Sequence, residues 1–281
     1  MTGRLVLVST PIGNLGDLSP RAVEALKACS LICCEDTRHS GKLLSHAGIS
    51  GIRLAVADEH RELARLDDVL GLLSSGLDVA VITDAGTPGI SDPGMRLVAA
   101  VVEAGHQVTA VPGPAALVMA LVLSGFDTTR FVFEGFIPRS GRERTDRLTE
   151  IAAERRTVVL YEAPHRMERT IADLTAACGD ERRIAMAREL TKLHEEVWRG
   201  SLLGAGQRLA EVPPRGEYVL VLQGAPAGEA ATDEQIVTAL RTALETGADR
   251  RSAIATVMAA TGAAKRRVYD LALTIPRDAD E

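Results

Sequence analysis

The first 125 residues alternate short apolar runs with segments of helical periodicity, and this alternation restricts the fold more than any other feature of the chain. The apolar runs cover residues 5–8, 31–34, 54–56, 79–82 and 108–111, and the helical patterns cover residues 20–28, 38–47, 60–75, 92–104 and 114–124. Strands that alternate with helices predict a parallel sheet with helices on both faces.

After Gly125 the spacing of the apolar runs changes. Strands are expected at residues 131–133, 158–161, 184–187, 196–199 and 218–221, with helices near 142–155, 166–177 and 203–210. The last strands follow one another closely and alternate apolar with polar residues, which favours antiparallel pairing and a mixed sheet. A small-residue linker and three helices, near 232–246, 250–260 and 263–273, complete the chain. The prediction is an α/β domain over 1–125, a second α/β domain over 126–224, and a linker with a helical appendage over 225–281.

The most patterned loop is Asp84–Gly94, which directly follows a predicted strand. Ligands of parallel α/β sheets bind at the carboxyl ends of the strands. The glycines and prolines of this loop allow close backbone approach and keep the loop stiff. Two further loops, Ser9–Asp17 and Val111–Ala116, follow other strands and should reach the same edge. The three loops predict a pocket for a small molecule.

Several common sites are disfavoured by the sequence. No loop has the Gly-x-Gly-x-x-Gly pattern or the phosphate loop with its Lys and Ser/Thr, so dinucleotide and nucleoside-triphosphate binding are poorly supported. The four cysteines lack metal spacing and the six histidines are scattered, so no metal site is expected.

The charge and hydropathy of the chain favour a soluble cytoplasmic protein. No apolar run reaches transmembrane length, and the N-terminus has no signal-peptide pattern, so no membrane partner is expected. The net charge of −6 argues against a protein whose whole surface coats nucleic acid. The densest basic stretch, Arg139–Arg147, is compatible with either a solvated helix face or a local nucleic-acid contact.

Several motifs resemble a known superfamily. Asp84–Gly94, Val111–Ala116 and Tyr161–Arg166 are similar to motifs of the tetrapyrrole-methylase superfamily of S-adenosylmethionine-dependent methyltransferases. Within this superfamily, the chain resembles one branch more narrowly: the ribosomal RNA small subunit methyltransferase I family. The segments that carry this narrower resemblance are Thr10–Asp17, Glu35–Arg38, Glu134–Pro138 and Arg188–Glu196. The resemblance runs in order from Arg4 to Gly224.

The resemblance implies a class III methyltransferase fold of two α/β domains, with S-adenosyl-L-methionine in the cleft between them. It also implies a homodimer and 2′-O-methylation of the ribose of a cytidine in 16S rRNA, within the small ribosomal subunit. Tetrapyrrole methylases usually carry a Val-Gly-x-Gly-Pro-Gly loop after the first strand. The corresponding residues here are Val8–Gly13, without that pattern, which favours the rRNA branch over a porphyrin-like substrate.

The resemblance also implies a set of residues around the cofactor, taken from the three loops and from the second domain. These residues are Pro11, Gly13, Asp84, Ala85, Gly86, Thr87, Pro88, Gly89, Ile90, Ser91, Asp92, Pro112, Gly113, Ala116, Tyr161 and Ala187.

A ribose hydroxyl is a poor nucleophile until it loses its proton, so a base or a charge stabiliser should be near the methyl donor. Glu35, Asp36 and Arg38 follow the second strand and are the catalytic candidates. Asp36 would accept the proton and Arg38 would stabilise charge or hold a phosphate. The same residues are also typical of a helix start capped by Asp or Thr. His165, Glu189 and Lys192 are further candidates, and the sequence does not single out one base.

RNA binding needs cations near the cleft, because phosphates dominate the affinity. The expected RNA-contacting residues are Arg139, Arg142, Arg144 and Arg147, with Arg38, His39 and Lys42 as additional cations. Two other functions stay open from the sequence. One is methylation of a small substrate such as a tetrapyrrole, and the other is ribosome assembly or RNA binding without turnover.

Overall fold

The computed structural model describes residues 2–58, 61–226 and 231–275. Contacts within the chain group residues up to Gly224 into one unit and those from Ala225 into a second. The first unit contains two five-stranded sheets. The expected boundary between two α/β domains near residue 125 stays a prediction, and residues 227–230 of the expected linker lie outside the described residues.

The first sheet is entirely parallel, as the alternating pattern predicts. Its strands are β1 (Arg4–Val8), β2 (Leu31–Cys34), β3 (Arg53–Val56), β4 (Val79–Val81) and β5 (Gln107–Val111), in the order β3-β2-β4-β1-β5. The strands β4, β1 and β5 are neighbours, so the three loops that follow them emerge side by side at one edge.

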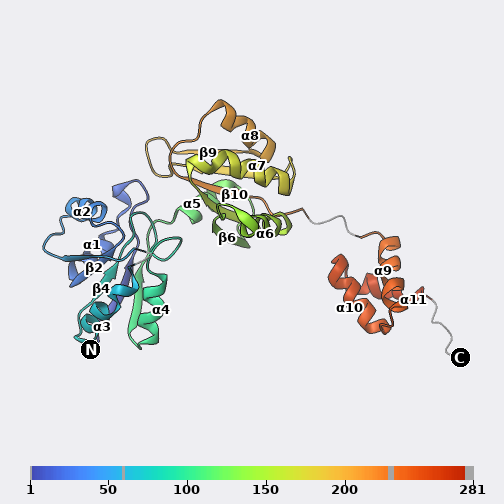
Figure 1. The fold of residues 1–281 in the computed structure, drawn as a ribbon, viewed down its shortest axis with the longest axis horizontal. Helices are drawn as coiled ribbons and strands as arrows, with labels where there is room; N and C mark the ends of the chain where they lie inside the picture. The colour runs from blue at the N-terminus through green and yellow to red at the C-terminus, as the bar shows by residue number, and fades with distance from the viewer. Residues whose placement is uncertain (1, 59–60, 227–230, 276–281) are drawn as a thin grey trace. The chain divides into compact units, whose positions relative to one another are not determined.

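Two helices cover each face of this sheet (Figure 1). The helices are α1 (Pro20–Ala28), α2 (Thr37–His46), α3 (Leu66–Ser74) and α4 (Met95–Glu103). The buried side chains of α1 and α2 join one core, and those of α3 and α4 join the core on the opposite face. Ser19 caps α1 by accepting a hydrogen bond from the Ala22 N–H, as expected of Ser before Pro.

Two predicted helices differ from the observed ones. The pattern over 60–75 corresponds to a 3₁₀ turn, Leu63–Arg65, followed by α3, and His60 lies outside the described residues. The helix expected from residue 92 begins only at Met95. The cause is Gly94, whose φ of 123° lies outside the helical region and is accessible to glycine alone at little cost.

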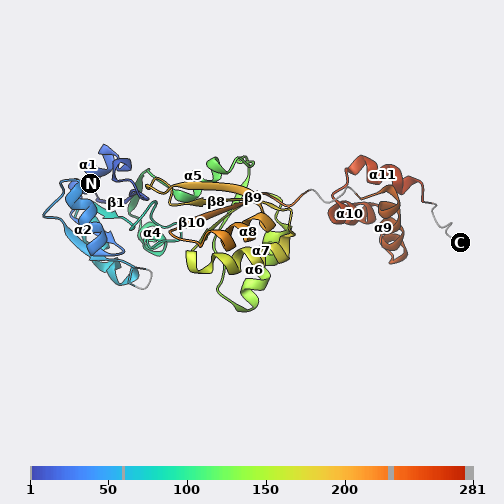
Figure 2. The ribbon, with the colours of Figure 1, turned by 90° about the horizontal axis from the view of Figure 1, so that it is seen from above.

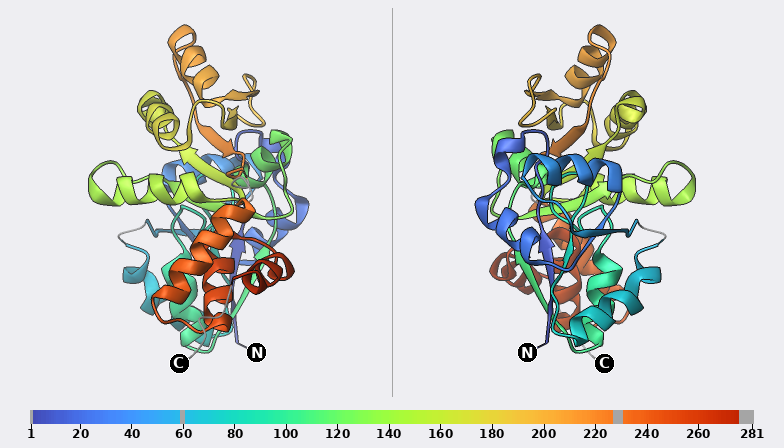
Figure 3. Two further views of the ribbon diagram at one scale, coloured as in Figure 1. Left: turned by 90° about the vertical axis from the view of Figure 1, so that its right-hand side faces the viewer. Right: turned by 90° about the vertical axis from the view of Figure 1, so that its left-hand side faces the viewer.

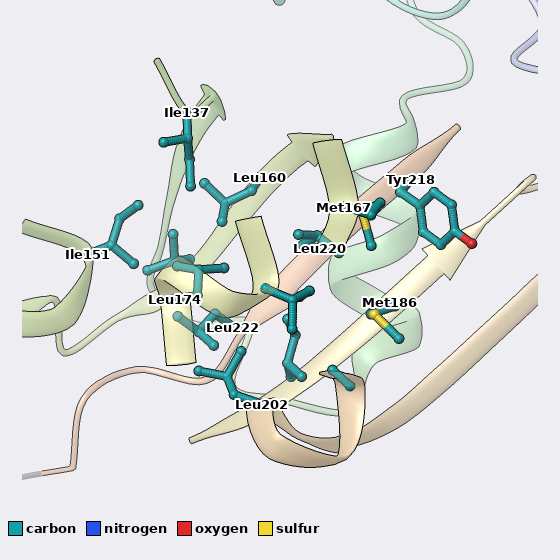
Figure 4. Close-up of a cluster of buried hydrophobic side chains, with 14 of the residues drawn as sticks. Ile137, Ile151, Leu160, Met167, Leu174, Met186, Leu202, Tyr218, Leu220 and Leu222 are labelled. Atoms are coloured by element: carbon teal, nitrogen blue, oxygen red, sulfur yellow. The ribbon is translucent and has the colours of Figure 1, made fainter. Parts of the chain in front are cut away.

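The second sheet is mixed, as expected. Its strands are β6 (Phe131–Phe136), β7 (Thr157–Glu162), β8 (Arg183–Arg188), β9 (Glu196–Ser201) and β10 (Tyr218–Leu222), in the order β6-β7-β10-β8-β9. Only the β6–β7 pair is parallel. The helices α6 (Gly141–Ala153), α7 (Met167–Cys178) and α8 (Leu202–Glu211) bury their apolar side chains against one face. Figure 4 shows this core, with Leu160 and Leu220 of the sheet facing Met167 and Leu174 of α7.

The opposite face of the second sheet is covered by α5 (Ala116–Ser124). Leu117, Ala120 and Leu121 of this helix pack with Val159 and Val219 of the sheet. The helix follows β5 in sequence, yet its packing partner is the second sheet. The chain therefore passes from one sheet to the other through α5.

The second unit is a bundle of three helices, α9 (Asp233–Glu245), α10 (Arg250–Thr261) and α11 (Lys265–Leu273), seen together in Figures 2 and 3. Ile236, Leu240, Val257 and Val268 lie in its core and are buried. The bundle confirms the three helices expected there. Among the helices that the structure describes, none combines the length and the apolar character needed to cross a membrane.

One residue of the expected RNA-contacting set is buried in the second sheet's layer of helices. Arg144 is only 4% exposed. Its guanidinium group donates to the Asp173 carboxylate at 2.8 Å, to the Pro138 carbonyl at 2.9 Å and to the Thr170 hydroxyl at 3.2 Å. All of these are contacts within the protein, so the role expected of Arg144 in RNA binding is replaced by a structural one.

We expect Arg144→Ala to destabilise the second sheet by about 2–3 kcal/mol, because it leaves the buried partners of the guanidinium unsatisfied. Arg142→Ala is the matched control, since the Arg142 side chain is 93% exposed, and its effect should stay within about 0.5 kcal/mol. Urea unfolding followed by the fluorescence of Trp198, the single tryptophan, measures both. Equal stabilities of the two variants would contradict the structural role.

Candidate functional site

The loops after β1, β4 and β5 are joined to one another by hydrogen bonds. Thr10 and Gly86 form an antiparallel bridge, with N–H···O distances of 2.8 and 3.1 Å. The Thr87 hydroxyl donates to the Pro114 carbonyl at 3.1 Å and lies 3.1 Å from the Ser9 hydroxyl. One side chain, Thr87, therefore links all three loops, and the expectation that the loops converge is confirmed.

We call the three joined loops, Ser9–Asp17, Asp84–Gly94 and Val111–Ala116, the cradle. Glycines in the cradle allow its loops to approach one another closely. A Cβ on Gly113 would lie 2.9 Å from Ser9 Cβ, and one on Gly86 would lie 3.3 Å from Ile12 Cγ2. Gly86 also has a φ of 90°, which other residues avoid. Glu62 fixes the end of the Asp84–Gly94 loop. This residue is 3% exposed, and its carboxylate accepts a hydrogen bond from the Gly94 N–H at 2.7 Å. The loops of the cradle are therefore held in fixed positions by close packing and hydrogen bonds.

Three carboxylates gather at the carboxyl ends of β2 and β4. They belong to Glu35, Asp84 and Asp92. Burial raises the pKa of Asp92 to about 6, with further increases from the charges of Glu35 and Asp84. Burial and the Asp84 charge also raise the pKa of Glu35. Thr83 donates a long hydrogen bond of 3.4 Å to Glu35. The result is a negatively charged site in which two carboxyl groups bind protons more readily than usual.

The second sheet contributes residues that face this loop. An added Cβ on Gly135, at a bulge in β6, would lie 3.3 Å from Ser91 Oγ. Tyr161 of β7 packs edge-on against Phe133 and Phe136, at centroid distances of 5.0 and 5.7 Å. Burial raises the pKa of Tyr161, and the charge of Asp92 adds to this effect. The Asp84–Gly94 loop therefore lies near Tyr161 and Gly135, and the cofactor role that the resemblance implies for Tyr161 stays a prediction.

The loop between β8 and β9 closes over the first loop. A Cβ on Gly13 would lie 2.3 Å from Lys192 Cγ, so the glycine is what admits this loop. The Lys192 ammonium binds Glu189 at 3.0 Å and Glu217 at 2.8 Å. Glu189 also accepts a hydrogen bond from the Glu217 N–H at 3.0 Å. Lys192 and Glu189, two further candidates from the sequence analysis, therefore hold this loop in place beside the first loop.

Asp36 and Arg38 have the arrangement of a capped helix start. Asp36 accepts a hydrogen bond from the Arg38 N–H at 2.8 Å, and the two side chains form an ion pair at 2.7 Å. The hydrogen bond from the Arg38 side chain lowers the pKa of Asp36 to about 2. A carboxylate with so low a pKa is a weak proton acceptor. Glu35, whose pKa is raised, is better suited to that role.

The remaining predicted residues are distributed as follows. Ala187 is 1% exposed, and its side chain lies in the core beneath α5. His165 is exposed in a 3₁₀ turn, Pro164–Arg166. Arg139 and Arg142 are exposed, whereas Arg147 forms ion pairs with Glu134 and Glu150. The cofactor and RNA roles of these residues stay predictions.

The sequence reasoning missed several residues that build the site. Thr83, Glu62 and Glu217 hold or adjoin the loops, as described above. Thr83 directly precedes the Asp84–Gly94 loop, which was a usable signal. Glu62 and Glu217 contact residues that are distant in the sequence, so no local pattern marked them as site residues. Among the described residues, no group of His, Cys, Asp or Glu is suited to hold a metal ion.

The residues of the cradle fit S-adenosylmethionine, which the resemblance implies. Within the described part of the chain, the Asp84 Oδ1 atom is buried and has no hydrogen-bond partner. It is therefore free to accept from a ligand hydroxyl or amine. The carboxylates favour a cation, and S-adenosylmethionine carries a positively charged sulfur. The glycine-rich loops leave backbone groups accessible at short range.

We expect Asp92→Asn to change how stability depends on pH. Since the folded state raises the pKa of Asp92 above its ordinary value of 3.8, this carboxyl group contributes stability below about pH 4. The contribution is lost as pH rises through about 6. The variant should therefore be more stable than the parent at pH 7.5, by about 1 kcal/mol after solvent screening is allowed for.

Urea unfolding at a series of pH values from about 4 to 7.5 measures this difference. Asp17→Asn, at an exposed carboxylate of the first loop, is the control. A difference between Asp92→Asn and the parent that does not change with pH would contradict the raised pKa.

Comparison with known proteins agrees with this geometry. A family model described as "Tetrapyrrole (Corrin/Porphyrin) Methylases" matches residues 4–204. The ribosomal RNA small subunit methyltransferase I of Synechocystis sp. is 45% identical over 98% of this chain and 99% of its own length. The protein of the same name from Escherichia coli O157:H7 is 40% identical over 96% of this chain and 95% of its own length.

Solved structures share the fold at low sequence identity. The methyltransferase CobJ superposes with a TM-score of 0.60 at 20% identity, covering 80% of this chain and 95% of that one. Uroporphyrin-III-C-methyltransferase from Thermus thermophilus gives 0.56 at 21% identity, covering 79% and 94%. The chain is a methyltransferase of the tetrapyrrole methylase fold, with S-adenosylmethionine as its methyl donor. It belongs to the tetrapyrrole methylase family and, within it, to the ribosomal RNA small subunit methyltransferase I group.

Proposed function

We propose that this chain transfers a methyl group from S-adenosylmethionine to 16S rRNA of the small ribosomal subunit, at the ribose 2′-oxygen of a cytidine. The observation that carries this proposal is the 45% identity to a ribosomal RNA small subunit methyltransferase I over 98% of the chain. Because the substrate is ribosomal, we also propose that the protein works in the cytoplasm.

The cradle is suited to hold the donor in one orientation. When bound, S-adenosylmethionine supplies a methyl group on a positively charged sulfur, which makes that methyl electrophilic. The unpartnered Asp84 oxygen would accept a hydrogen bond from a hydroxyl or amine of S-adenosylmethionine. Gly86 and Gly113 would let the loops approach the cofactor closely. Holding donor and acceptor in line supplies a large part of the rate increase in such transfers.

The carboxylates beside the cradle are suited to take the proton from the ribose hydroxyl. A general base works best when its pKa lies near the working pH. Asp92, with a pKa of about 6, and Glu35, whose pKa is also raised, meet that requirement better than Asp36 does. We therefore assign proton acceptance to the Glu35–Asp92 pair and give Arg38 a role in binding phosphate.

The exposed cations near the site support contact with an RNA backbone. Arg142 lies in the first turn of α6, Arg139 lies two residues before this helix, and both are exposed, while the Arg38 side chain is 88% exposed. Phosphate contacts from such side chains position an RNA without reading its sequence. We keep Arg139, Arg142 and Arg147 as RNA contacts of this site.

Methyl transfer to purified subunits tests the proposal. The protein is incubated with methyl-labelled S-adenosylmethionine and small ribosomal subunits from cells lacking the corresponding enzyme, and the digested RNA is analysed by mass spectrometry. We expect 2′-O-methylcytidine. Parallel reactions with protein-free 16S rRNA and with a porphyrinoid identify the preferred substrate. Methylation of the porphyrinoid alone would support a small-molecule methylase. Cofactor binding without any transfer would support an assembly factor.

We expect Thr87→Val to weaken cofactor binding by roughly 5- to 20-fold. The substitution keeps the shape of the side chain but removes the two hydrogen bonds of the Thr87 hydroxyl, each contributing about 1 kcal/mol. Thr87→Ser keeps the hydroxyl group and should bind nearly as the parent does. Titration calorimetry with S-adenosylmethionine measures all three proteins, and equal affinities for Thr87→Val and Thr87→Ser would count against the cradle.

We also propose that the protein is a homodimer and that α5 forms the interface. This helix is apolar on all sides, which is typical of a helix covered all round. One side packs on the second sheet, yet the other side is exposed in the single chain. The exposed side chains are Val118 at 41%, Met119 at 42%, Val122 at 61% and Leu123 at 39%. A second copy of the chain would cover them.

We expect Val122→Glu to convert the dimer into monomers, because it places a charge at the centre of the apolar face. Val102→Glu on α4, at a position 58% exposed, is the matched control and should remain dimeric. Sedimentation velocity at micromolar concentration measures both. A parent protein that is already monomeric, or a dimeric Val122→Glu variant, would rule out this interface.

A further inference from the structure

The helical unit after Ala225 has its own core and therefore a defined surface. Seven buried side chains from α9, α10 and α11, together with Ile275 just after α11, form that core among the described residues. The alignment with the Synechocystis relative spans 98% of the chain, so it includes this unit. The loops that form the methyl-transfer site all belong to the first unit. The helical unit thus has a core and a fold of its own.

The last two helices are connected as in a helix-turn-helix unit. α10 ends at Thr261 and α11 begins at Lys265, with Gly262 in the left-handed region at a φ of 64°. A short turn containing glycine is typical of this motif. In its nucleic-acid-binding members, residues at the start of the second helix contact the nucleic acid. The corresponding residues here are Lys265 and Arg266.

The outer face of α11 combines cations with apolar groups. Lys265 and Arg266 are exposed, and Tyr269 and Leu273, one and two turns later, are 49% and 55% exposed. Val268 and Ala272 lie on the buried face of the same helix. We call the exposed side chains Lys265, Arg266, Tyr269 and Leu273 the α11 face. Asp270 is also exposed on this helix, next to Tyr269.

The cations of the α11 face oppose the stability of their own helix. The first turn of α11 holds three basic residues and no acidic one, and the Ala264 cap provides no side-chain hydrogen bond. Cations are unfavourable at this end of a helix dipole. The starts of α9 and α10 are capped by Thr232 and Asp249. The basic first turn of α11 is therefore less favourable for the helix than a capped or acidic first turn would be.

Two other cations of the unit, Arg250 and Arg267, have partners within the protein. Arg267 pairs with Asp233 at 2.7 Å, and Arg250 donates to the Ile275 carbonyl at 2.8 Å. These residues join α11 to its neighbours and thereby fix the orientation of the helix. Lys265 and Arg266, the exposed cations of α11, are therefore presented on a rigid support.

We propose that the α11 face is a second RNA-binding surface, which holds the ribosomal substrate by its phosphodiester backbone, with Tyr269 against the sugar or an unpaired base. The inference rests on the proposed function, since the RNA is the substrate of the first unit. Lys265 and Arg266 neutralise phosphates, and an exposed tyrosine provides a stacking surface. A second copy of the chain is a poor occupant, because self-pairing of the face would bring its cations together.

Binding of the full-length protein to small ribosomal subunits tests this surface. The test variant combines Lys265→Gln with Arg266→Gln. The matched control combines Arg241→Gln with Arg251→Gln, which removes the same charge from exposed positions on α9 and α10. Dissociation constants are measured by filter binding between about 50 and 300 mM KCl, and thermal melting checks that both variants are folded.

We expect the test variant to bind at least about fivefold more weakly at 100 mM KCl, with the control within about twofold of the parent. The slope of log K against log salt should fall by roughly 1.4 to 1.8 in the test variant, as expected for two lost phosphate contacts. Tyr269→Ala should weaken binding without changing the slope. S-adenosylmethionine affinity should be unchanged in every variant.

Equal affinities for the test variant and the control would overturn the proposal. So would a test variant that loses binding to a ribosomal protein while protein-free 16S rRNA binds as before, because the partner would then be a protein. The two proposals can fail separately. A parent that methylates 16S rRNA with no effect of the α11 variants leaves the methyltransferase function intact. A parent that binds RNA through α11 but methylates none leaves only the binding surface.

Discussion

The candidate site depends on the antiparallel bridge between Thr10 and Gly86. The bridge forms because β4 and β1 are neighbours in a parallel sheet, which brings their loops together at one edge. Gly86 takes a positive φ there, and Thr87 extends the link to the loop after β5. The order of the strands thus determines which loops meet, and the glycines determine how closely they meet.

The electrostatics of the site follow from the same geometry. Glu35 and Asp92 come from separate loops and share a partly buried space with Asp84. Negative charges in proximity raise one another's pKa, and a bound cation would lower them again. A site of this kind favours a positively charged donor and retains carboxylates able to accept a proton. Asp36 follows Glu35 directly and is paired with Arg38. This pairing lowers the pKa of Asp36, whereas the pKa of Glu35 is raised.

Much of the fold was predictable because it depends on local patterns. The alternation of apolar runs and helices gave the first sheet, and the patterned loop led to the site. The burial of Arg144 was also readable, because it precedes Leu148 and Ile151 by one and two turns on the helix face that packs inward. The sheet on which α5 packs could not be predicted from the sequence, since a helix that is apolar on all sides does not specify which surface it covers. Nor were the pKa values of Glu35 and Asp92, which depend on contacts across the fold.

Ile12 connects the two sheets of the first unit. Its backbone belongs to the loop after β1, while its side chain lies in the core shared by α5 and the second sheet. A ligand that orders this loop therefore also stabilises the packing around Ile12, and loss of that packing would release the loop. A ligand that binds the candidate site only in the folded protein would therefore also stabilise the second core, to which Ile12 belongs.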